Sequence, residues 1–151
     1  MRRFLSIVSV AGCLAWAQES KPDLTGTWQL DTARSEMNST KPLVLTWLIQ
    51  EKGGSIGMKQ VEKDEGGHER QVAFTCGIGG KECAFKEPDG QVKASFWYNG
   101  PMLVEMKTLH NDHVGRYRMK LGEDGKTLDV EFTSIAPASD KTDHLVFSKR
   151  Q

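Results

Sequence analysis

Hydrophobic and polar residues alternate along much of the chain with the two-residue period of a β-strand. In the segment 127–133, Leu128, Val130 and Phe132 alternate with two acidic residues, which places the apolar side chains on one face of the strand. Similar alternation recurs in several other segments. The pattern therefore predicts an all-β protein.

Short turn signals separate the alternating segments, because pairs of Gly, Asn or Asp tolerate the positive φ angles of tight hairpin turns. The pairs are Gly53-Gly54, Gly66-Gly67, Gly79-Gly80, Asp89-Gly90, Asn99-Gly100, Asn111-Asp112 and Asp124-Gly125. About ten strands follow, at 26–31, 42–51, 54–62, 67–75, 82–86, 91–98, 101–109, 114–121, 127–134 and 142–149. Strands joined by tight turns pair antiparallel, so we predict an up-and-down β-barrel of about 8–10 strands, which leaves no exposed edge.

Two segments depart from simple alternation. The run 43–49 is apolar on both faces, so we expect both faces of this strand to be covered. The segment 32–37 begins with a capping threonine and contains Glu36, which allows one or two helical turns as a lid. We expect at most this short helical turn after the first strand.

The N-terminal part of the chain differs from the rest. Two arginines precede an uncharged, mostly apolar run, 4–17, that ends in small residues around a tryptophan. This order is typical of a secretory signal peptide. We therefore predict a signal peptide at 1–17, a short leader at 18–23 and one barrel domain at 24–151, exported to the periplasm or the extracellular space.

Cys13 supports a second interpretation of the same segment. It follows Val10-Ala11-Gly12, as the lipidated cysteine of a bacterial lipoprotein does, and a lipid on Cys13 would anchor the protein to a membrane. The apolar run continues past Cys13, which favours cleavage after Ala17 and soluble export. No later stretch approaches the roughly 20 apolar residues of a transmembrane helix, so the sequence predicts no transmembrane segment.

Cys76 and Cys83 are the two cysteines of the predicted mature chain. An even pair in an oxidising compartment predicts a disulfide, worth about 2 to 3 kcal/mol on chain-entropy arguments. Two free thiols or half of a metal site are the alternatives. The spacing lacks the close Cys-x2-Cys pattern of zinc ligands and redox pairs, so we expect a structural bond across the end of a hairpin.

Charge and motif content argue against several function classes. The chain has 20 basic and 20 acidic residues, so no global positive field attracts nucleic acid. His110 and His113 flank a predicted turn without a third fixed ligand, which predicts a solvated turn and no metal site. The nucleophile elbow, zinc-protease and phosphate-loop motifs are absent from the sequence. We predict no catalytic residues and no cofactor.

The first predicted strand carries Gly26-Thr27-Trp28, and Gly-x-Trp at this place resembles the opening motif of lipocalins and related calycin barrels. The chain is also similar to small secreted bacterial lipocalin-like proteins in three further segments, 31–35, 123–128 and 146–150. These segments lie at both ends of the predicted domain. The resemblance implies a lipocalin-like fold and does not identify a ligand.

The resemblance also implies a structural role for Trp28, which would close one end of the barrel. A basic residue of the last strand, Lys149 or Arg150, would lie over the face of the indole. A cation in that position contributes about 0.5 to 2 kcal/mol, and burial of the indole removes a large apolar area from water.

Large apolar residues of the predicted strands would line the interior of such a barrel. Methionine adapts to apolar ligands of varied shape, and aromatic side chains supply wide contact surfaces. The provisional ligand-binding residues are Trp47, Phe96, Tyr98, Met102, Met106 and Met119. We therefore predict an exported protein that binds a small apolar or amphipathic ligand, although the same residues would also suit a filled core.

Two other functions stay open on the sequence alone. With a filled core, the domain would be an envelope protein-interaction module, such as a hydrolase inhibitor, that acts through loops including 76–83. A barrel-type isomerase or cyclase would instead need an ionisable group with a shifted pKa facing a cavity. The acids that are candidates for burial are Glu36, Glu62, Glu105 and Asp143.

Overall fold

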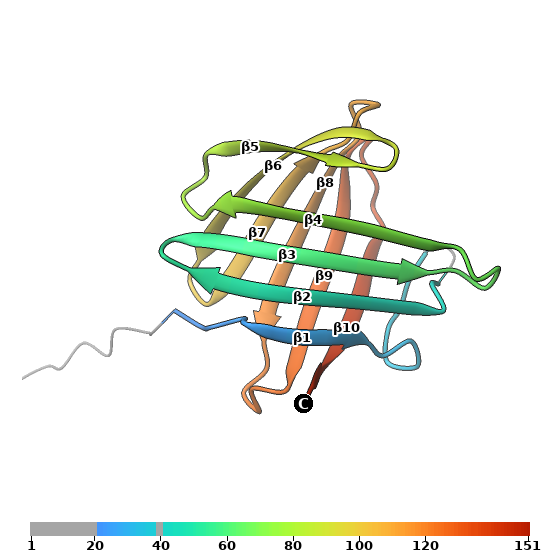
Figure 1. The fold of residues 1–151 in the computed structure, drawn as a ribbon, viewed down its shortest axis with the longest axis vertical. Helices are drawn as coiled ribbons and strands as arrows, with labels where there is room; N and C mark the ends of the chain where they lie inside the picture. The colour runs from blue at the N-terminus through green and yellow to red at the C-terminus, as the bar shows by residue number, and fades with distance from the viewer. Residues whose placement is uncertain (1–20, 39–40) are drawn as a thin grey trace, which may run out of the picture.

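The computed structural model describes residues 21–38 and 41–151, in which ten antiparallel strands form one sheet that curls into a barrel (Figure 1). The strands are β1 (Gly26–Leu30), β2 (Val44–Lys52), β3 (Ser55–Lys63), β4 (Glu69–Gly77), β5 (Glu82–Glu87), β6 (Gly90–Asn99), β7 (Met102–Thr108), β8 (Val114–Leu121), β9 (Thr127–Ala136) and β10 (Thr142–Arg150). They closely match the predicted ranges, and the all-β antiparallel barrel is confirmed.

Some predictions concern residues that the structure does not describe. The predicted signal peptide at 1–17, with Cys13, lies outside the described residues, and so do residues 18–20 of the predicted leader. Among the residues that are described, no helix has the length and apolar character needed to cross a membrane.

Strands that follow one another in the chain pair with each other throughout the sheet, with one exception. The order in the sheet is β4-β3-β2-β1-β10-β9-β8-β7-β6-β5, so the first and last strands pair in its middle, with Trp28 opposite Lys149. The two strands at the ends of this order, β4 and β5, contact each other without a ladder of backbone hydrogen bonds. We call this border between β4 and β5 the seam.

The connection from β1 to β2 forms a hydrogen-bonded turn at 32–34 instead of a helix. The Asp31 side chain accepts hydrogen bonds from the backbone N–H groups of the next residues, and the Ser35 hydroxyl donates to the Asp31 carbonyl at 2.7 Å. Glu36 then forms a backbone bridge with His144 of β10. These local side-chain bonds compete with helix formation, and they hold the connection against β10.

The run 43–49 is covered on one face only, contrary to our expectation. Trp47 and Ile49 of β2 point into the barrel and are buried. On the other face, Leu48 is 38% exposed, and Leu43, which precedes β2, is 58% exposed. No described element crosses this outer face.

Inward-pointing side chains fill one half of the barrel completely. Each is removed from water, and such burial contributes about 1.5 to 3 kcal/mol per large apolar side chain. The fully buried residues of this filled half are Leu24, Trp28, Ile49, Ile56, Phe96, Leu103, Met119, Leu128 and Phe147. They make up half of the buried residues of the hydrophobic core.

Trp28 lies at the closed end of the filled half. Its indole Nε1–H donates to the Leu24 carbonyl at 2.9 Å, so the chain segment that precedes β1 covers the end of the barrel. The Lys149 Nζ lies 5.2 Å from the centre of the indole ring. The basic residue over Trp28 is therefore Lys149. Arg150 lies opposite Thr27 in the β1–β10 ladder, on the other face of β10, and is exposed.

Candidate functional site

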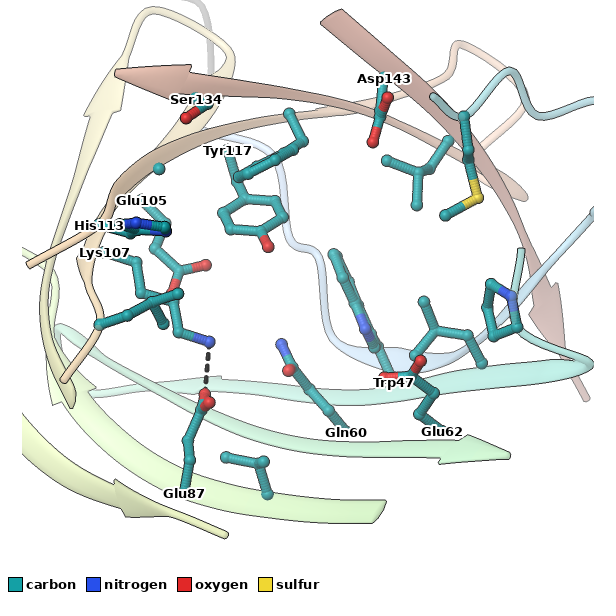
Figure 2. Close-up of a pocket in the computed structure, with 18 of the residues that line it drawn as sticks. Trp47, Gln60, Glu62, Glu87, Glu105, Lys107, His113, Tyr117, Ser134 and Asp143 are labelled. Carbon is teal, nitrogen blue, oxygen red and sulfur yellow. Dashed lines mark hydrogen bonds and ion pairs between the residues drawn. The ribbon is translucent and has the colours of Figure 1, made fainter. Parts of the chain in front are cut away.

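The other half of the barrel, which we call the hollow half, encloses a cavity of about 440 Å³. It opens at the end of the barrel opposite Trp28, beside the connections between β1 and β2 and between β7 and β8. Apolar side chains at its mouth are Met37, Pro42, Leu45, Leu109 and Val114. Deeper in, the lining becomes aromatic and polar (Figure 2).

An aromatic group forms one wall of the cavity. Trp47 of β2 lies against Phe147, with ring centres 4.4 Å apart, at the border with the filled half. The Tyr117 ring meets Trp47 edge-on at 6.4 Å and lies 4.7 Å from the Phe132 ring. These contacts fix the rings by packing, so the wall presents flat apolar faces to the cavity.

A glycine in β8 makes room for this wall. The β8–β9 ladder has an irregularity between Val114 and Gly115, and a Cβ atom on Gly115 would lie 2.5 Å from the Phe132 ring. Only glycine fits at this distance. Gly115 therefore allows the Phe132 ring to lie close against the barrel wall instead of further into the cavity.

Glu87 of β5 holds the two long basic side chains of the lining. Its carboxylate is 5% exposed and pairs with Arg70 at 2.8 Å and with Lys107. Arg70 also pairs with Asp89 at 2.8 Å. A buried carboxylate is costly unless charged partners compensate it, and Glu87 has two. Both cations are thereby engaged within the protein.

Glu105 of β7 is the buried acid that has no such partner. Its side chain is 2% exposed, it lies opposite Tyr117 in the β7–β8 ladder, and no described residue donates a hydrogen bond to its carboxylate. Figure 2 shows the carboxyl directed into the cavity. Burial raises the pKa of Glu105 to about 7; the Lys107 charge opposes this rise and the Glu87 charge adds to it.

The pKa of the Tyr117 hydroxyl reflects the acidic groups around the cavity. Burial is the main cause that raises the pKa of its hydroxyl well above the usual range, and the charges of four acids raise it further. These acids, in order of effect, are Glu105, Glu87, Asp143 and Glu62. All four line the same cavity. Of the four acids that the sequence offered for burial, Glu36 alone does not line it.

Asp143 and Glu62 stand nearer the mouth. Asp143 of β10 accepts hydrogen bonds from the backbone N–H of Asn38 at 2.8 Å and from its side-chain amide at 2.6 Å, which ties the β1–β2 connection to the barrel. Glu62 lies opposite Arg70 in the β3–β4 ladder and is exposed. The mouth therefore also carries negative charge.

The structure brings one of the six provisional ligand-binding residues to the cavity, and that residue is Trp47. Phe96 and Met119 lie in the filled half, where neighbouring side chains surround them completely. Tyr98 belongs to the closed end, since its hydroxyl donates to the Glu51 carboxylate at 2.7 Å. That bond and burial raise the pKa of the Tyr98 hydroxyl well above its usual range, with burial as the larger cause.

Met102 and Met106 lie on the outer face of β7, half-buried, because it is Leu103, Glu105 and Lys107 that point inward. The sequence predicts the face with Met102 and Met106 to be the inner one, and the structure corrects this prediction. The cavity residues that this choice missed are the two charged ones. A signal is present in the sequence, because Tyr117 shares a face of its strand with Met119, which we predict to line the interior, and a short turn places Tyr117 opposite Glu105.

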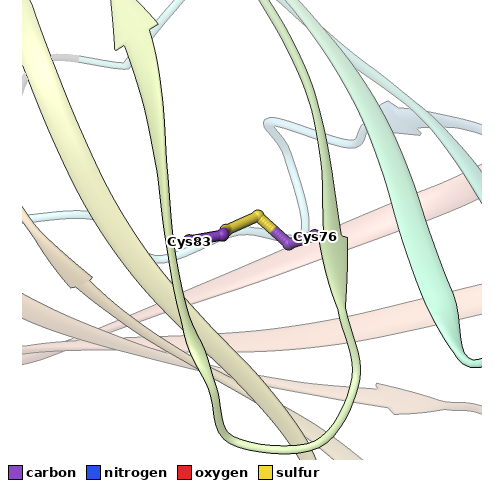
Figure 3. The surroundings of a disulfide bond; sticks show 2 residues. All are labelled: Cys76 and Cys83. Atoms are coloured by element: carbon purple, nitrogen blue, oxygen red, sulfur yellow. A yellow bond between two sulfur atoms is a disulfide. The ribbon is translucent and has the colours of Figure 1, made fainter.

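The seam is bridged by side chains in place of a backbone ladder. The disulfide between Cys76 and Cys83 joins β4 and β5 near the closed end of the barrel, with Cα atoms 5.9 Å apart (Figure 3). Phe74 and Phe85 stack at 4.1 Å midway along the seam. The Arg70–Glu87 ion pair crosses it at the cavity. The predicted disulfide is thus present, but it links two unpaired strand edges and not the end of a hairpin.

The histidine pair lies at the β7–β8 turn. His110 and His113 are both exposed, and His113 lies at the cavity mouth. Within the described residues, no group of three or more His, Cys, Asp or Glu side chains is arranged to hold a metal ion.

No family model matches the chain, and no curated protein matches it in sequence. Solved structures do match. A secretory abundant heat-soluble protein of Ramazzottius varieornatus is similar over 87% of this chain and 98% of its own, with a TM-score of 0.65 at 13% identity. A fatty-acid-binding protein of Manduca sexta is similar over 84% of this chain and 99% of its own, with a TM-score of 0.59 at 16% identity.

A zebrafish ileal bile acid-binding protein, in complex with cholic acid, is similar over 84% of this chain and 97% of its own, with a TM-score of 0.52 at 15% identity. At these identities the likeness concerns the fold. The chain therefore has the fold of calycin-like β-barrels, as its opening motif implied.

Proposed function

We propose that this protein binds one small apolar or amphipathic molecule inside the hollow half of the barrel. The observation that carries the proposal is the division of the interior: the same strands fill one half and leave about 440 Å³ in the other. Ligand pockets typically measure about 300 to 1,000 Å³. Similar barrels include a fatty-acid-binding protein and a bile acid-binding protein with cholic acid, which supports a ligand of this class.

The lining suits a molecule with two unlike ends. Met37, Leu45 and Leu109 offer apolar contacts at the mouth, while Glu105 and Tyr117 place polar atoms further in. A purely apolar ligand would leave the buried Glu105 carboxyl without a partner, which costs free energy. An amphipathic ligand satisfies both regions.

We further propose that the protein works after export from the cytoplasm. The disulfide at the seam supports this location, because such bonds persist in oxidising compartments. The order of charged, apolar and small residues at the N-terminus supports it independently. Cleavage after residue 17 is part of the same proposal.

An isomerase or cyclase would use an ionisable group in the cavity, and Glu105 meets that requirement. A general base, however, is normally oriented by a hydrogen bond from a further group. No described residue supplies one to the Glu105 carboxyl. We therefore assign Glu105 to ligand binding and propose no catalytic residue. An envelope module that acts through the 76–83 loop has no comparable observation in its favour.

Two neighbouring residues of β3 provide a matched test. Gln60 points into the cavity opposite Trp47, and Lys59 is exposed on the outer face. Gln60→Phe places a ring inside the cavity, while Lys59→Phe adds the same ring outside. The neutral dye N-phenyl-1-naphthylamine reports occupation of an apolar site by its fluorescence. We expect the dye to bind the wild type and Lys59→Phe alike and to lose about tenfold or more in affinity for Gln60→Phe.

Circular dichroism and urea unfolding establish that both variants are folded before the dye is added. Equal dye binding by both variants would place the dye outside the cavity. Absence of dye binding by the folded wild type would remove the basis for a small-ligand function.

A further inference from the structure

The base of the cavity holds a carboxylate that the protein itself leaves unsatisfied. Two residues before Glu105 on β7, Leu103 belongs to the filled half; two residues after it, Lys107 points toward the mouth. Glu105 therefore stands where the cavity ends. It is 2% exposed, its side chain is directed into the open space, and no described residue donates a hydrogen bond to it.

Two further polar groups face the same space. Figure 2 shows the Tyr117 hydroxyl and the Gln60 side-chain amide directed toward the region in front of Glu105. Neither forms a side-chain hydrogen bond with any described residue, and both line the cavity. Figure 2 draws the Gln60 amide nitrogen nearest this space. Rotation of the amide brings its oxygen forward, so that a carboxylate, a hydroxyl oxygen and an amide oxygen become three acceptors. Together they match a donor with three hydrogens.

The charges of the cavity favour a cation over an anion. Lys107 and Arg70 are bound by Glu87, and Arg70 by Asp89 as well. The carboxylates that lack a basic partner in the described structure are Glu105 at the base and Asp143 and Glu62 above it. An anionic head group would have to enter among these acids and draw the cations away from Glu87. A cationic head group would supply the charged partner that Glu105 lacks.

We propose that the ligand is an amphiphile with a protonated amine, which binds with its ammonium group against Glu105 at the base and its apolar chain toward the mouth. The inference rests on the proposed ligand-binding function and adds the chemical class and orientation of the ligand. The ammonium group donates to the Glu105 carboxylate, the Tyr117 hydroxyl and the Gln60 amide oxygen. The chain lies against Trp47 and leaves between Leu45 and Leu109.

Three ligands of equal chain length test the head group. Decylammonium, decanol and decanoate are each used below the concentration at which they aggregate, and each displaces N-phenyl-1-naphthylamine from the protein at pH 8. We expect decylammonium to bind about tenfold or more tightly than decanoate, the difference that a buried charge pair produces. Decanol should fall between them.

Two variants assign the effect to one carboxyl. Glu105→Gln keeps the shape and removes the charge, so the preference for decylammonium should fall to about threefold or less. Glu123→Gln makes the same change in the exposed turn between β8 and β9, at the closed end, and should keep the full preference. Urea unfolding confirms that each variant is folded.

The pH dependence supplies a further measurement. The groups around the Glu105 carboxyl are Lys107 on its own strand, Tyr117 on β8, Glu87 on β5, Arg70 on β4, Glu62 on β3 and Asp143 on β10. Protonation of Glu105 removes the partner of the ammonium group. Decylammonium should therefore bind the wild type more weakly at pH 5 than at pH 8, while decanol changes little. The Glu105→Gln variant should show a smaller change.

Each outcome has a distinct meaning. Tighter binding of decanoate than of decylammonium, or a preference that Glu105→Gln leaves unchanged, overturns the amine proposal while the ligand-binding function stands. Failure of all three ligands and of the dye to bind overturns both proposals.

Discussion

Along β6, β7 and β8, the inward side chains in the filled half are Phe96, Leu103 and Met119, all fully buried. Nearer the mouth on β7 and β8, the next inward residues are Glu105 and Tyr117, at the base of the hollow half. The two halves therefore share the same strands and ladders. They differ only in the side chains that those strands direct into the barrel. The filled half gains apolar burial, whereas the hollow half bears the cost of a buried acid.

This difference separates stability from function within one sheet. A binding site needs space and unsatisfied polar groups, and both lower the stability of the free protein. In this barrel the filled half and the disulfide near the closed end can offset that cost, because the same continuous ladders hold the walls of the hollow half. Three changes test the division.

Two leucines on or beside β7 compare the halves directly. Leu103 is fully buried in the filled half, and Leu109 is half-buried at the cavity mouth. Leu103→Ala should lower the free energy of unfolding by about 2 to 5 kcal/mol, since it leaves a void in a packed core. Leu109→Ala borders open space already and should cost about 1 kcal/mol or less. Urea unfolding followed by tryptophan fluorescence measures both; equal losses would contradict the division into two halves.

Glu105→Gln tests the cost of the buried acid. Because the pKa of Glu105 is raised from 4.5 to about 7 in the folded protein, the folded state holds this proton more tightly than the unfolded state. The wild type should therefore lose stability as the pH rises from about 4.5 to about 7, by up to about 3 kcal/mol in total, and lose no more above that. The variant lacks this loss.

The unfolding free energies of wild type and Glu105→Gln should thus be similar at pH 4, and the variant should be the more stable protein at pH 8. Glu123→Gln, whose carboxyl is exposed, should follow the wild type at both values. A difference between wild type and Glu105→Gln that is the same at pH 4 and pH 8 would show that Glu105 is not buried as a charged group.

The disulfide tests whether the halves can be separated experimentally. Replacing both Cys76 and Cys83 with alanine should lower the free energy of unfolding by about 2 to 3 kcal/mol. The bond lies near the closed end, so affinity for the neutral dye should change by about twofold or less. Loss of dye binding in a folded double variant would mean that the seam also positions the cavity.

The strands could be predicted because their signals are local. Turn pairs such as Asp124-Gly125 fix where a hairpin reverses, and the alternation that follows in β9 assigns Leu128, Val130 and Phe132 to the interior. The resemblance carried by the Gly26-Thr27-Trp28 motif also implied that Trp28 would close one end of the barrel. Each of these inferences depends on residues that are close together in the chain.

The cavity could not be predicted in the same way. Alternation tells which side chains point inward but not how far along the barrel axis they lie or what stands opposite. In β7 the rule that polar residues face outward gave the wrong face, because Glu105 and Lys107 point inward and their charges are met by groups from other strands. Likewise, Tyr98 points inward as expected, but Glu51 from β2 holds it at the closed end.

The seam also has a consequence for the topology of the chain. Read from β5 through β10 and then from β1 to β4, the sheet is one uninterrupted meander in which each strand pairs with the next. β1 and β10, the first and last strands in the sequence, meet in the middle of that meander, where Thr27 lies opposite Arg150. A circular permutant opened between Gly79 and Gly80, with a linker from the end of β10 to the start of β1, would keep every strand ladder, and the disulfide would then tie its first strand to its last.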